Sequence, residues 1–220
     1  MTWSHHDGRA ARRGYHHGNL REALIDATLA LIAEKGPAGF TLAEATRLAG
    51  VSPAAPYRHF RDSEALLAEV ALRGFDRLAE ALGAAWNDGR PDPSTAFEAL
   101  GRAYLGFARA EPAYYAAMFE TSVASERYPP LAAAGDRAFG VLRHAAEHLT
   151  AQIPKPDRPP ALMVALHVWA LSHGIATLFC RPDRTHRTLP MAPEELLEAG
   201  VLLYLQGLGL AGGRPRNNEP

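Results

Sequence analysis

The chain has 220 residues, of which 47% are hydrophobic and 21% charged, with one cysteine and a formal net charge of -1. This composition excludes collagen-like, disordered and disulfide-scaffold proteins, and the length fits one large domain or a small domain joined to a larger one. The single cysteine, Cys180, cannot form an internal disulfide. We therefore expect a reducing compartment and a cytoplasmic protein.

Basic residues are concentrated near the N-terminus. Residues 1–62 hold eight Lys and Arg against six Asp and Glu, a net charge of +2, which leaves -3 for the remainder. Residues 1–18 lack the apolar stretch of a secretory signal and are predicted to be a flexible basic arm. An arm that contacts a partner and a tail without function fit this composition equally well. The near-zero total charge therefore does not exclude a nucleic-acid partner.

Helix signals recur along the chain after residue 19, which predicts an all-α fold. Asn19 and Glu22 match a capping box, in which two side chains bond to each other's backbone amides. Thr41 and Glu44 repeat this signal before a short helix over 42–49, and Ser52 followed by proline predicts a third helix. Further helices are expected from Ser63 to Trp86 and over 94–110, 112–122, 130–152, 159–180 and 193–209. No segment shows the alternation of a strand.

Residues 41–60 have the pattern of a helix-turn-helix, in which two short helices flank a turn at 49–51 and the second can lie in a DNA major groove. Small residues at 53–55 leave the first turn open to base edges, and the Tyr-Arg-His run at 57–59 suits phosphate and groove contacts. Helix N-termini offer further amides to phosphates. The candidate DNA contacts are Thr41, Ser52, Pro53, Ala54, Ala55, Tyr57, Arg58, His59, Arg61 and Ser63. A helical corner that only packs is the alternative.

Two stretches resemble a known family. The segment AGVSPAAPYRHFRDSEALL, preceded by TLAEATRL, resembles the TetR family of bacterial transcriptional regulators. The resemblance implies a homodimer, a palindromic operator in double-stranded DNA and an all-helical ligand-binding body. Trp169 with His173-Gly174, together with YHHGNLREAL from Tyr15 to Leu24, is similar to the WHG subgroup, named for a Trp and a His-Gly pair.

The chain departs from the family pattern at a few positions. Ala45-Thr46 stands where the family often has Ile-Ala, and Ser63 where it commonly has a phosphate-contacting lysine, a role that Arg61 is a candidate to fill. Pro56 lacks an amide hydrogen and would clash with the carbonyl four residues earlier in a helix that began at Pro53. We therefore expect the regular helix to begin slightly later.

Aromatic and thioether residues cluster in the second half of the chain. A pocket for a small apolar or aromatic molecule needs such a lining with a few polar groups, which Tyr104, Tyr114, Tyr115 and His173 are able to supply. Ordinary core packing is the alternative for each residue. The candidate ligand contacts are Tyr104, Phe107, Tyr115, Met118, Phe119, Trp169 and His173.

The segment 159–180 contains no charged residue and is long enough to span a bilayer. Internal polar residues and a flanking arginine on each side favour instead a helix buried among others or at a subunit interface. The 193–209 helix carries a second apolar surface, and by the family resemblance the two helices form a four-helix dimer interface. Burial within one subunit is the alternative. We expect no membrane partner.

The sequence contains no clear metal-binding or catalytic pattern. His144 and His148 lie four residues apart, a spacing that can ligate zinc, but no third ligand is identifiable, so we expect a solvated helix face and neither metal nor cofactor. An enzyme with His167 and His173 in a cleft is an alternative that lacks an acid–base pair and a nucleophile. We therefore do not expect an enzyme.

These observations predict a ligand-released repressor that binds its operator as a homodimer. The expected organisation is the arm at 1–18, a helix-turn-helix domain at 19–62, a ligand-binding and dimerisation domain at 63–210 and a disordered tail at 211–220. A small-molecule-binding or interaction module with a weakened DNA head, and an activator, are the alternatives. The identity of the ligand and the operator sequence do not follow from the sequence.

Overall fold

The computed structural model describes residues 20–180 and 190–210, so the expected arm at 1–18 and tail at 211–220 lie outside it. Within those ranges the chain is helical and has no strand, which agrees with the predicted all-α class. The α-helices are α1 Leu20–Lys35, α2 Leu42–Leu48, α3 Ser63–Trp86, α4 Pro93–Ala110, α5 Pro112–Phe119, α6 Pro129–Thr150, α7 Ala161–Phe179 and α8 Pro193–Gly207. Of the boundaries predicted for the second half, that of α5 differs most, since it ends at Phe119 rather than at 122.

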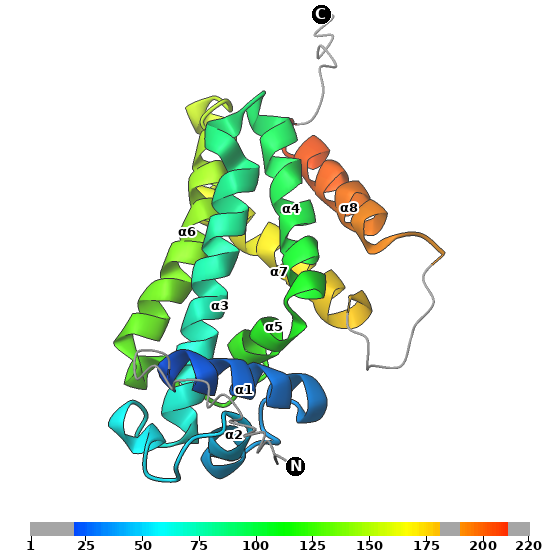
Figure 1. Ribbon diagram of the computed structural model, residues 1–220. Helices are drawn as coiled ribbons and strands as arrows, with labels where there is room; N and C mark the ends of the chain where they lie inside the picture. Colours follow the sequence, from blue (N-terminus) through cyan, green and yellow to red (C-terminus); the bar gives the residue numbers. More distant parts are fainter. Residues whose placement is uncertain (1–19, 181–189, 211–220) are drawn as a thin grey trace, which may run out of the picture.

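The long helix α3 connects the two ends of the molecule. In Figure 1, α1 and α2 lie at one end with the first turns of α3, and α3 then runs between α4 and α6 to the far end. Asp62 caps its start, because the Asp62 Oδ1 atom accepts a hydrogen bond from the Ala65 amide at 2.8 Å. Leu66 and Leu67 are buried near this start, and Leu78 and Leu82 are buried further along. One rigid element therefore contributes to both parts of the fold.

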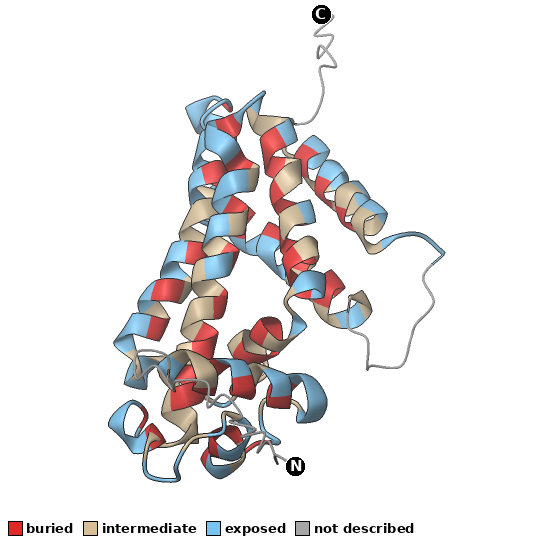
Figure 2. Ribbon diagram, in the orientation of Figure 1, coloured by how far each residue is buried: buried red, intermediate tan, exposed pale blue. Residues whose placement is uncertain are grey.

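The core lies between the helices, with buried residues on the facing sides of α3, α4 and α6 (Figure 2). The buried threonine and serine residues each donate their hydroxyl within their own helix. Thr46, at the position where the family often has alanine, donates its hydroxyl to the Leu42 carbonyl at 2.6 Å. Thr28, Thr150 and Ser172 make the same bond to the carbonyl four residues earlier. The polar departure at Thr46 therefore leaves no unsatisfied hydroxyl in the core.

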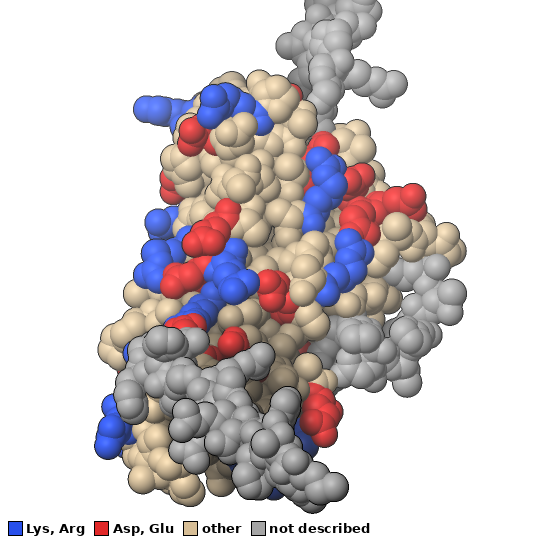
Figure 3. All heavy atoms as spheres, viewed as in Figure 1, with Lys and Arg blue, Asp and Glu red and all other residues tan. Residues whose placement is uncertain are grey.

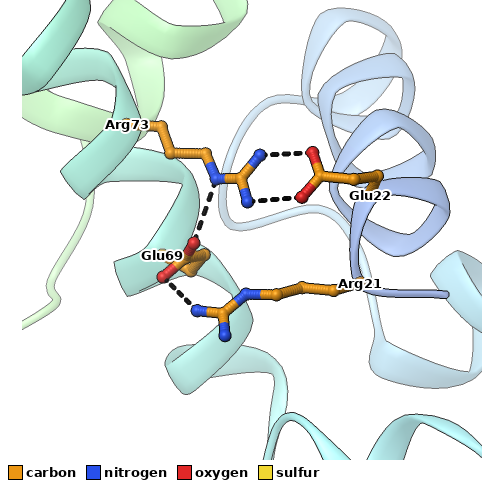
Figure 4. Close-up of polar contacts among 4 residues, drawn as sticks. All are labelled: Arg21, Glu22, Glu69 and Arg73. Atoms are coloured by element: carbon orange, nitrogen blue, oxygen red, sulfur yellow. Dashed lines mark hydrogen bonds and ion pairs between the residues drawn. The ribbon is translucent and has the colours of Figure 1, made fainter. Parts of the chain in front are cut away.

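An ion-pair cluster fastens α1 to α3 (Figure 4). Both terminal nitrogens of Arg73 donate to the carboxylate of Glu22, at 2.5 and 2.7 Å, and Arg73 Nε donates to Glu69 at 3.0 Å. Arg21 adds a second ion pair to Glu69 at 2.7 Å. The hydrogen bonds from Arg73 lower the pKa of Glu22. The predicted capping box of Asn19 and Glu22 is not tested, because Asn19 lies outside the described residues, and the Glu22 carboxylate pairs with Arg73 on α3.

The helix α7 is long and apolar enough to cross a membrane by length and composition alone. In this fold it packs against α4, α6 and α8, and Val164, Ala165, Val168 and Ala176 are buried in those contacts. Its other side exposes apolar residues, among them Leu178, which is 57% exposed. A helix at the surface of a helical body accounts for this composition.

Candidate DNA-binding and ligand-binding sites

The start of α2 is held by the predicted capping box. The Glu44 amide donates to Thr41 Oγ1 at 3.2 Å, and the Thr41 amide donates to Glu44 Oε2 at 2.9 Å. Lys35, at the end of α1, donates to the other Glu44 oxygen at 2.8 Å. The hydrogen bonds from Lys35 and Thr41 lower the pKa of Glu44 to about 2. Thr41 is exposed, so the capped N-terminus of α2 faces solvent.

The segment after α2 is not the α-helix that Ser52 and Pro53 predicted. The Ala55 amide donates to the Ser52 carbonyl at 3.0 Å in a turn, and only Pro56–Arg58 forms a helical turn, of the 3-10 type. The reason is Pro56, because it lacks the amide hydrogen that an α-helix starting at Pro53 would donate to the Ser52 carbonyl. Helical structure begins later than Pro53, as expected, but it is a three-residue 3-10 turn and not the regular helix that was predicted.

The short turn presents a polar edge to solvent. Pro56 and Phe60 are buried, and Phe60 is only 4% exposed, so they anchor the segment to the core. Between them, Tyr57 is 66% exposed, and Arg58 and His59 are also exposed. Ser52, Pro53 and Ala54 are exposed beside them and Ala55 is half-buried. The structure therefore brings the predicted contacts at 52–59 together on one surface.

Arg61 and Ser63 lie where the segment joins α3. The Arg61 side chain is 71% exposed, and its Nε donates to Asp62 Oδ2 at 2.8 Å. This bond raises the pKa of Arg61. Because Asp62 is also the cap of α3, the Arg61 cation rests against the carboxylate that begins that helix. Ser63 is half-buried in the first turn of α3.

A cavity of about 330 Å³ lies in the body between α3, α4, α6 and α7. Three of the predicted ligand contacts line it: Tyr104, Phe119 and Trp169. The sequence reasoning missed most of the wall, although Phe75, Leu78 and Leu82 follow one another on α3 at helical spacing. The other lining residues are Leu100, Gly101, Gly135, Ala138, Phe139, Leu142, Leu166, Val168 and Ser172.

His173 lies behind this wall in a polar cluster. Its Nδ1 atom is 2.9 Å from the Tyr104 hydroxyl and 3.0 Å from the Tyr115 hydroxyl. The Tyr115 hydroxyl is also 3.1 Å from Thr177 Oγ1. Burial lowers the pKa of His173, so the ring is neutral at physiological pH, and burial raises the pKa of Tyr104. Tyr115 and His173 therefore support the cavity wall and do not line the cavity.

The remaining predicted contacts also lie off the cavity. Met118 packs against α3 at Gly74 and lines a separate hollow of about 340 Å³ between α3, α5 and α6. Phe107 is 7% exposed in the core. Tyr114 is buried, with the Arg77 guanidinium 4.8 Å from its ring centre. Periodicity did not separate core from cavity because both kinds of residue recur at the same helical spacing.

His144 and His148 are exposed on α6, as the prediction of a solvated face requires. Their ring centres lie 4.5 Å apart, and both rings pack edge-on against Trp86. Within residues 20–180 and 190–210, no group of three His, Cys, Asp or Glu side chains is arranged to hold a metal ion.

On the face shown in Figure 3, basic and acidic side chains of the body lie side by side. Ion pairs join several basic and acidic side chains of the body: Arg77 with Glu111, Arg102 with Glu198, Arg109 with Glu194 and Arg137 with Asp76. Three of these pairs join different helices, and Arg77 on α3 binds Glu111 in the link between α4 and α5, so the pairs neutralise charge where elements meet. This face of the body therefore carries both positive and negative charge, unlike the mainly positive surface expected where a protein binds DNA.

Two family models match the chain where these two sites lie. The model of bacterial regulatory proteins of the tetR family matches residues 24–70, and the model of the tetracyclin repressor-like C-terminal domain matches residues 97–204. The chain belongs to the TetR family. It is accordingly a transcriptional regulator with a helix-turn-helix DNA-binding domain and a helical ligand-binding domain, and it is not an enzyme.

The chain is also similar to individual proteins. The uncharacterized HTH-type transcriptional regulator YobS of Bacillus subtilis is 29% identical over 100 residues, which are 46% of this chain and about half (51%) of YobS. A protein of unknown function from Rhodococcus sp. RHA1 has a similar structure, with 31% identity, a TM-score of 0.72 and coverage of 89% of this chain and 98% of that one. AibR, in complex with isovaleryl coenzyme A and operator DNA, is 18% identical with a TM-score of 0.64, covering 84% of this chain and 97% of its own, and shares the fold.

Proposed function

We propose that the protein is a repressor that binds a palindromic operator as a homodimer and leaves it when a small apolar or aromatic molecule fills the body cavity. The main support for this proposal is that helix α3 contacts both the DNA-binding segment and the cavity. Its first turns, capped by Asp62, bury Leu66 and Leu67 beside the helix-turn-helix, and its later turns supply Phe75 and Leu78 to the cavity wall. A molecule in the cavity therefore touches the same helix that positions the DNA-binding segment.

In the proposed complex the segment 52–59 enters the major groove. The exposed Tyr57, Arg58 and His59 side chains supply a hydroxyl, a cation and an imidazole to the groove edge and phosphates. The small residues at 53–55 let the backbone approach the bases. Thr41, Arg61 and Ser63 are proposed phosphate contacts, with Arg61 in the place of the family's lysine. For that role Arg61 must leave or share its bond to Asp62.

The dimer is proposed to form through α7 and α8. These helices pack on each other and expose large apolar side chains, including Leu166, Leu178, Leu202 and Leu203, the last of which is 69% exposed. Contiguous exposed apolar surface of this kind is typical of subunit interfaces. Two copies related by a twofold axis would cover it and present two heads to a palindrome.

Ligand release requires differential affinity. A molecule lowers operator affinity only to the extent that it binds better to the head spacing that does not fit DNA. AibR, whose structure contains both isovaleryl coenzyme A and operator DNA, is a protein of this fold that holds both kinds of partner. We assign residues 19–62 to the head and 63–210 to the body, place the body in the Trp/His-Gly subgroup, and expect the protein in the cytoplasm, where its DNA lies.

A gel-shift experiment with the DNA that flanks the protein's own gene tests this proposal. We expect a discrete shifted band at nanomolar protein, with two protomers per DNA by sedimentation. No shift from a chain that binds small molecules would favour the alternative of a binding module with a weakened DNA head, for which the short 3-10 turn is the supporting observation. Transcription from the flanking promoter with and without the protein separates a repressor from an activator.

A further inference from the structure

The wall of the body cavity is almost entirely carbon. Of the described residues that line it, none carries a charged side chain. Aromatic rings come from four helices and the end of α5, among them Phe75, Phe119, Phe139 and Trp169. The volume of about 330 Å³ is at the lower end of the range of about 300–1,000 Å³ for ligand pockets. The cavity therefore fits a small molecule with a mainly apolar surface.

Two hydroxyl groups belong to lining residues, and they differ in what they can offer. The Ser172 hydroxyl donates to the Val168 carbonyl of its own helix at 2.9 Å. The Tyr104 hydroxyl lies 2.9 Å from His173 Nδ1. When that ring nitrogen is unprotonated, the Tyr104 hydroxyl donates its hydrogen to it.

The cluster behind the wall lets Tyr104 change its partner at little cost. One ring nitrogen of a neutral imidazole makes one strong hydrogen bond, yet two tyrosine hydroxyls reach His173 Nδ1 at nearly equal distances. Tyr115 can satisfy that nitrogen by itself. If Tyr104 turns its hydrogen toward an oxygen in the cavity, His173 keeps a partner and no buried polar group is orphaned.

A charged group in the cavity would have no partner among the described lining residues to stabilise its charge. A buried carboxylate or ammonium needs a counter-ion or several hydrogen bonds to offset the loss of its hydration. The described wall supplies no counter-ion, and His173 is kept neutral by burial.

We infer that the cavity selects an uncharged, mainly apolar molecule with one hydrogen-bond acceptor, such as a ketone or ester oxygen, held by the Tyr104 hydroxyl. Carboxylates and ammonium ions of the same shape are rejected. This inference rests on the proposed ligand-binding role of the cavity and narrows the class of ligand that the cavity takes.

Calorimetric binding to the full-length chain tests the selection with shape-matched compounds. The aromatic set is 2-acetonaphthone, 2-ethylnaphthalene and 2-naphthoate, and the aliphatic set is 2-decanone and decanoate. In at least one set we expect the ketone to bind at least about 100-fold more tightly than the carboxylate, because the carboxylate is buried without a partner. Within the aromatic set, 2-acetonaphthone should bind about 3- to 10-fold more tightly than 2-ethylnaphthalene, because one neutral hydrogen bond contributes about that much affinity.

Variants identify the group responsible. Tyr104→Phe keeps the ring and should remove the preference for the ketone over the hydrocarbon while leaving hydrocarbon affinity unchanged. Tyr114→Phe is the matched control, since Tyr114 is a buried tyrosine that does not line the cavity. Ala138→Phe places a ring in the cavity and should abolish binding of the whole series, with folding checked by circular dichroism.

Three outcomes would overturn the inference: carboxylates that bind as tightly as the ketones, a ketone preference that survives in Tyr104→Phe, or no binding by any of the five compounds. The gel shift is read separately. A chain that shows the expected ligand selection but retains no DNA would contradict the proposed function and leave the ligand class standing.

Discussion

At the scale of single residues, Glu44 shows how a surface side chain can organise two helices. Its carboxylate accepts from the Thr41 amide, the Thr41 hydroxyl and the Lys35 ammonium, and so connects the end of α1 to the start of α2. These hydrogen bonds favour the charged form, and the pKa of Glu44 falls from 4.5 to about 2.

The lowered pKa predicts a pH dependence of stability. Because the folded-state pKa lies below the unfolded one, the contribution of Glu44 is present in full above about pH 4.5 and is lost as pH falls from 4.5 through about 2. Carbon-13 NMR titration of the Glu44 carboxyl group should show a midpoint near 2. Glu44→Gln should flatten the acid branch of the unfolding curve, whereas Glu80→Gln, at an exposed site on α3, should not. A midpoint near 4.5 would contradict the assigned contacts.

Side-chain contacts could be predicted from the sequence where the two interacting residues are close together in the chain. The capping box of Thr41 and Glu44 was predictable because its atoms lie three residues apart. Glu22 has the same spacing from Asn19, which lies outside the described residues, and its carboxylate pairs with Arg73, 51 residues away. A single sequence does not reveal such a distant partner. The polar partners of His173 were hidden for the same reason, since Tyr104 and Tyr115 belong to other helices.

At the scale of elements, α3 and α5 approach each other at a glycine. A Cβ atom on Gly74 would lie 2.6 Å from the Met118 sulfur and 3.3 Å from the Tyr114 Cβ. Gly83, on the same helix, has no such neighbour within 4 Å. The close approach explains why Met118 fills the crossing of the two helices and does not reach the cavity.

The two glycines give a matched pair of substitutions. Gly83→Ala should raise the free energy of unfolding by about 1 kcal/mol, because alanine favours the helix. Gly74→Ala gains the same propensity but forces Met118 and α5 to shift, which costs about 1–3 kcal/mol. Urea unfolding should therefore rank Gly74→Ala below Gly83→Ala by that margin. Equal stability of the two variants would show that α5 gives way freely at this crossing.

Element boundaries followed from prolines, glycines and caps, and most were predicted within two residues. The segment 52–60 is the exception that matters for function, because an α-helix was predicted there and a short 3-10 turn is found. Ser52-Pro53 is a good helix start by itself, but Pro56 follows three residues later and lacks the amide that would make the first hydrogen bond of the helix. The cavity was only partly predictable, because a cavity is the space left between helices and depends on how α3, α4, α6 and α7 are placed.

At the scale of the whole molecule, the uneven charge and the apolar face of α7 and α8 fit the proposed assembly. Residues 1–62 carry +2 and the rest of the chain -3, and the basic excess belongs to residues 1–18, because residues 19–62 hold equal numbers of basic and acidic residues. This modest N-terminal charge predicts weak non-specific DNA binding that fades with salt, which leaves specificity to the groove contacts.

The proposed interface predicts that one charge separates the protomers. Leu203→Arg places a cation in the centre of the apolar α7 and α8 face, where the partner's apolar surface would bury it without a counter-ion. Sedimentation should show a monomer for this variant and a dimer for the natural chain. Leu48→Arg is the matched control, since Leu48 is 55% exposed on α2, far from that face, and should leave the dimer intact. A dimeric Leu203→Arg would place the interface elsewhere.

The central claim is that the 52–59 segment reads DNA, and the affinity of Tyr57→Ala for the flanking DNA tests it most directly. Tyr57 is 66% exposed and supports no core contact that its loss would disturb. By fluorescence anisotropy we expect binding at least about tenfold weaker than that of the natural chain, with the dimer and the melting temperature unchanged. Affinity equal to that of the natural chain, in an intact dimer, would contradict the account.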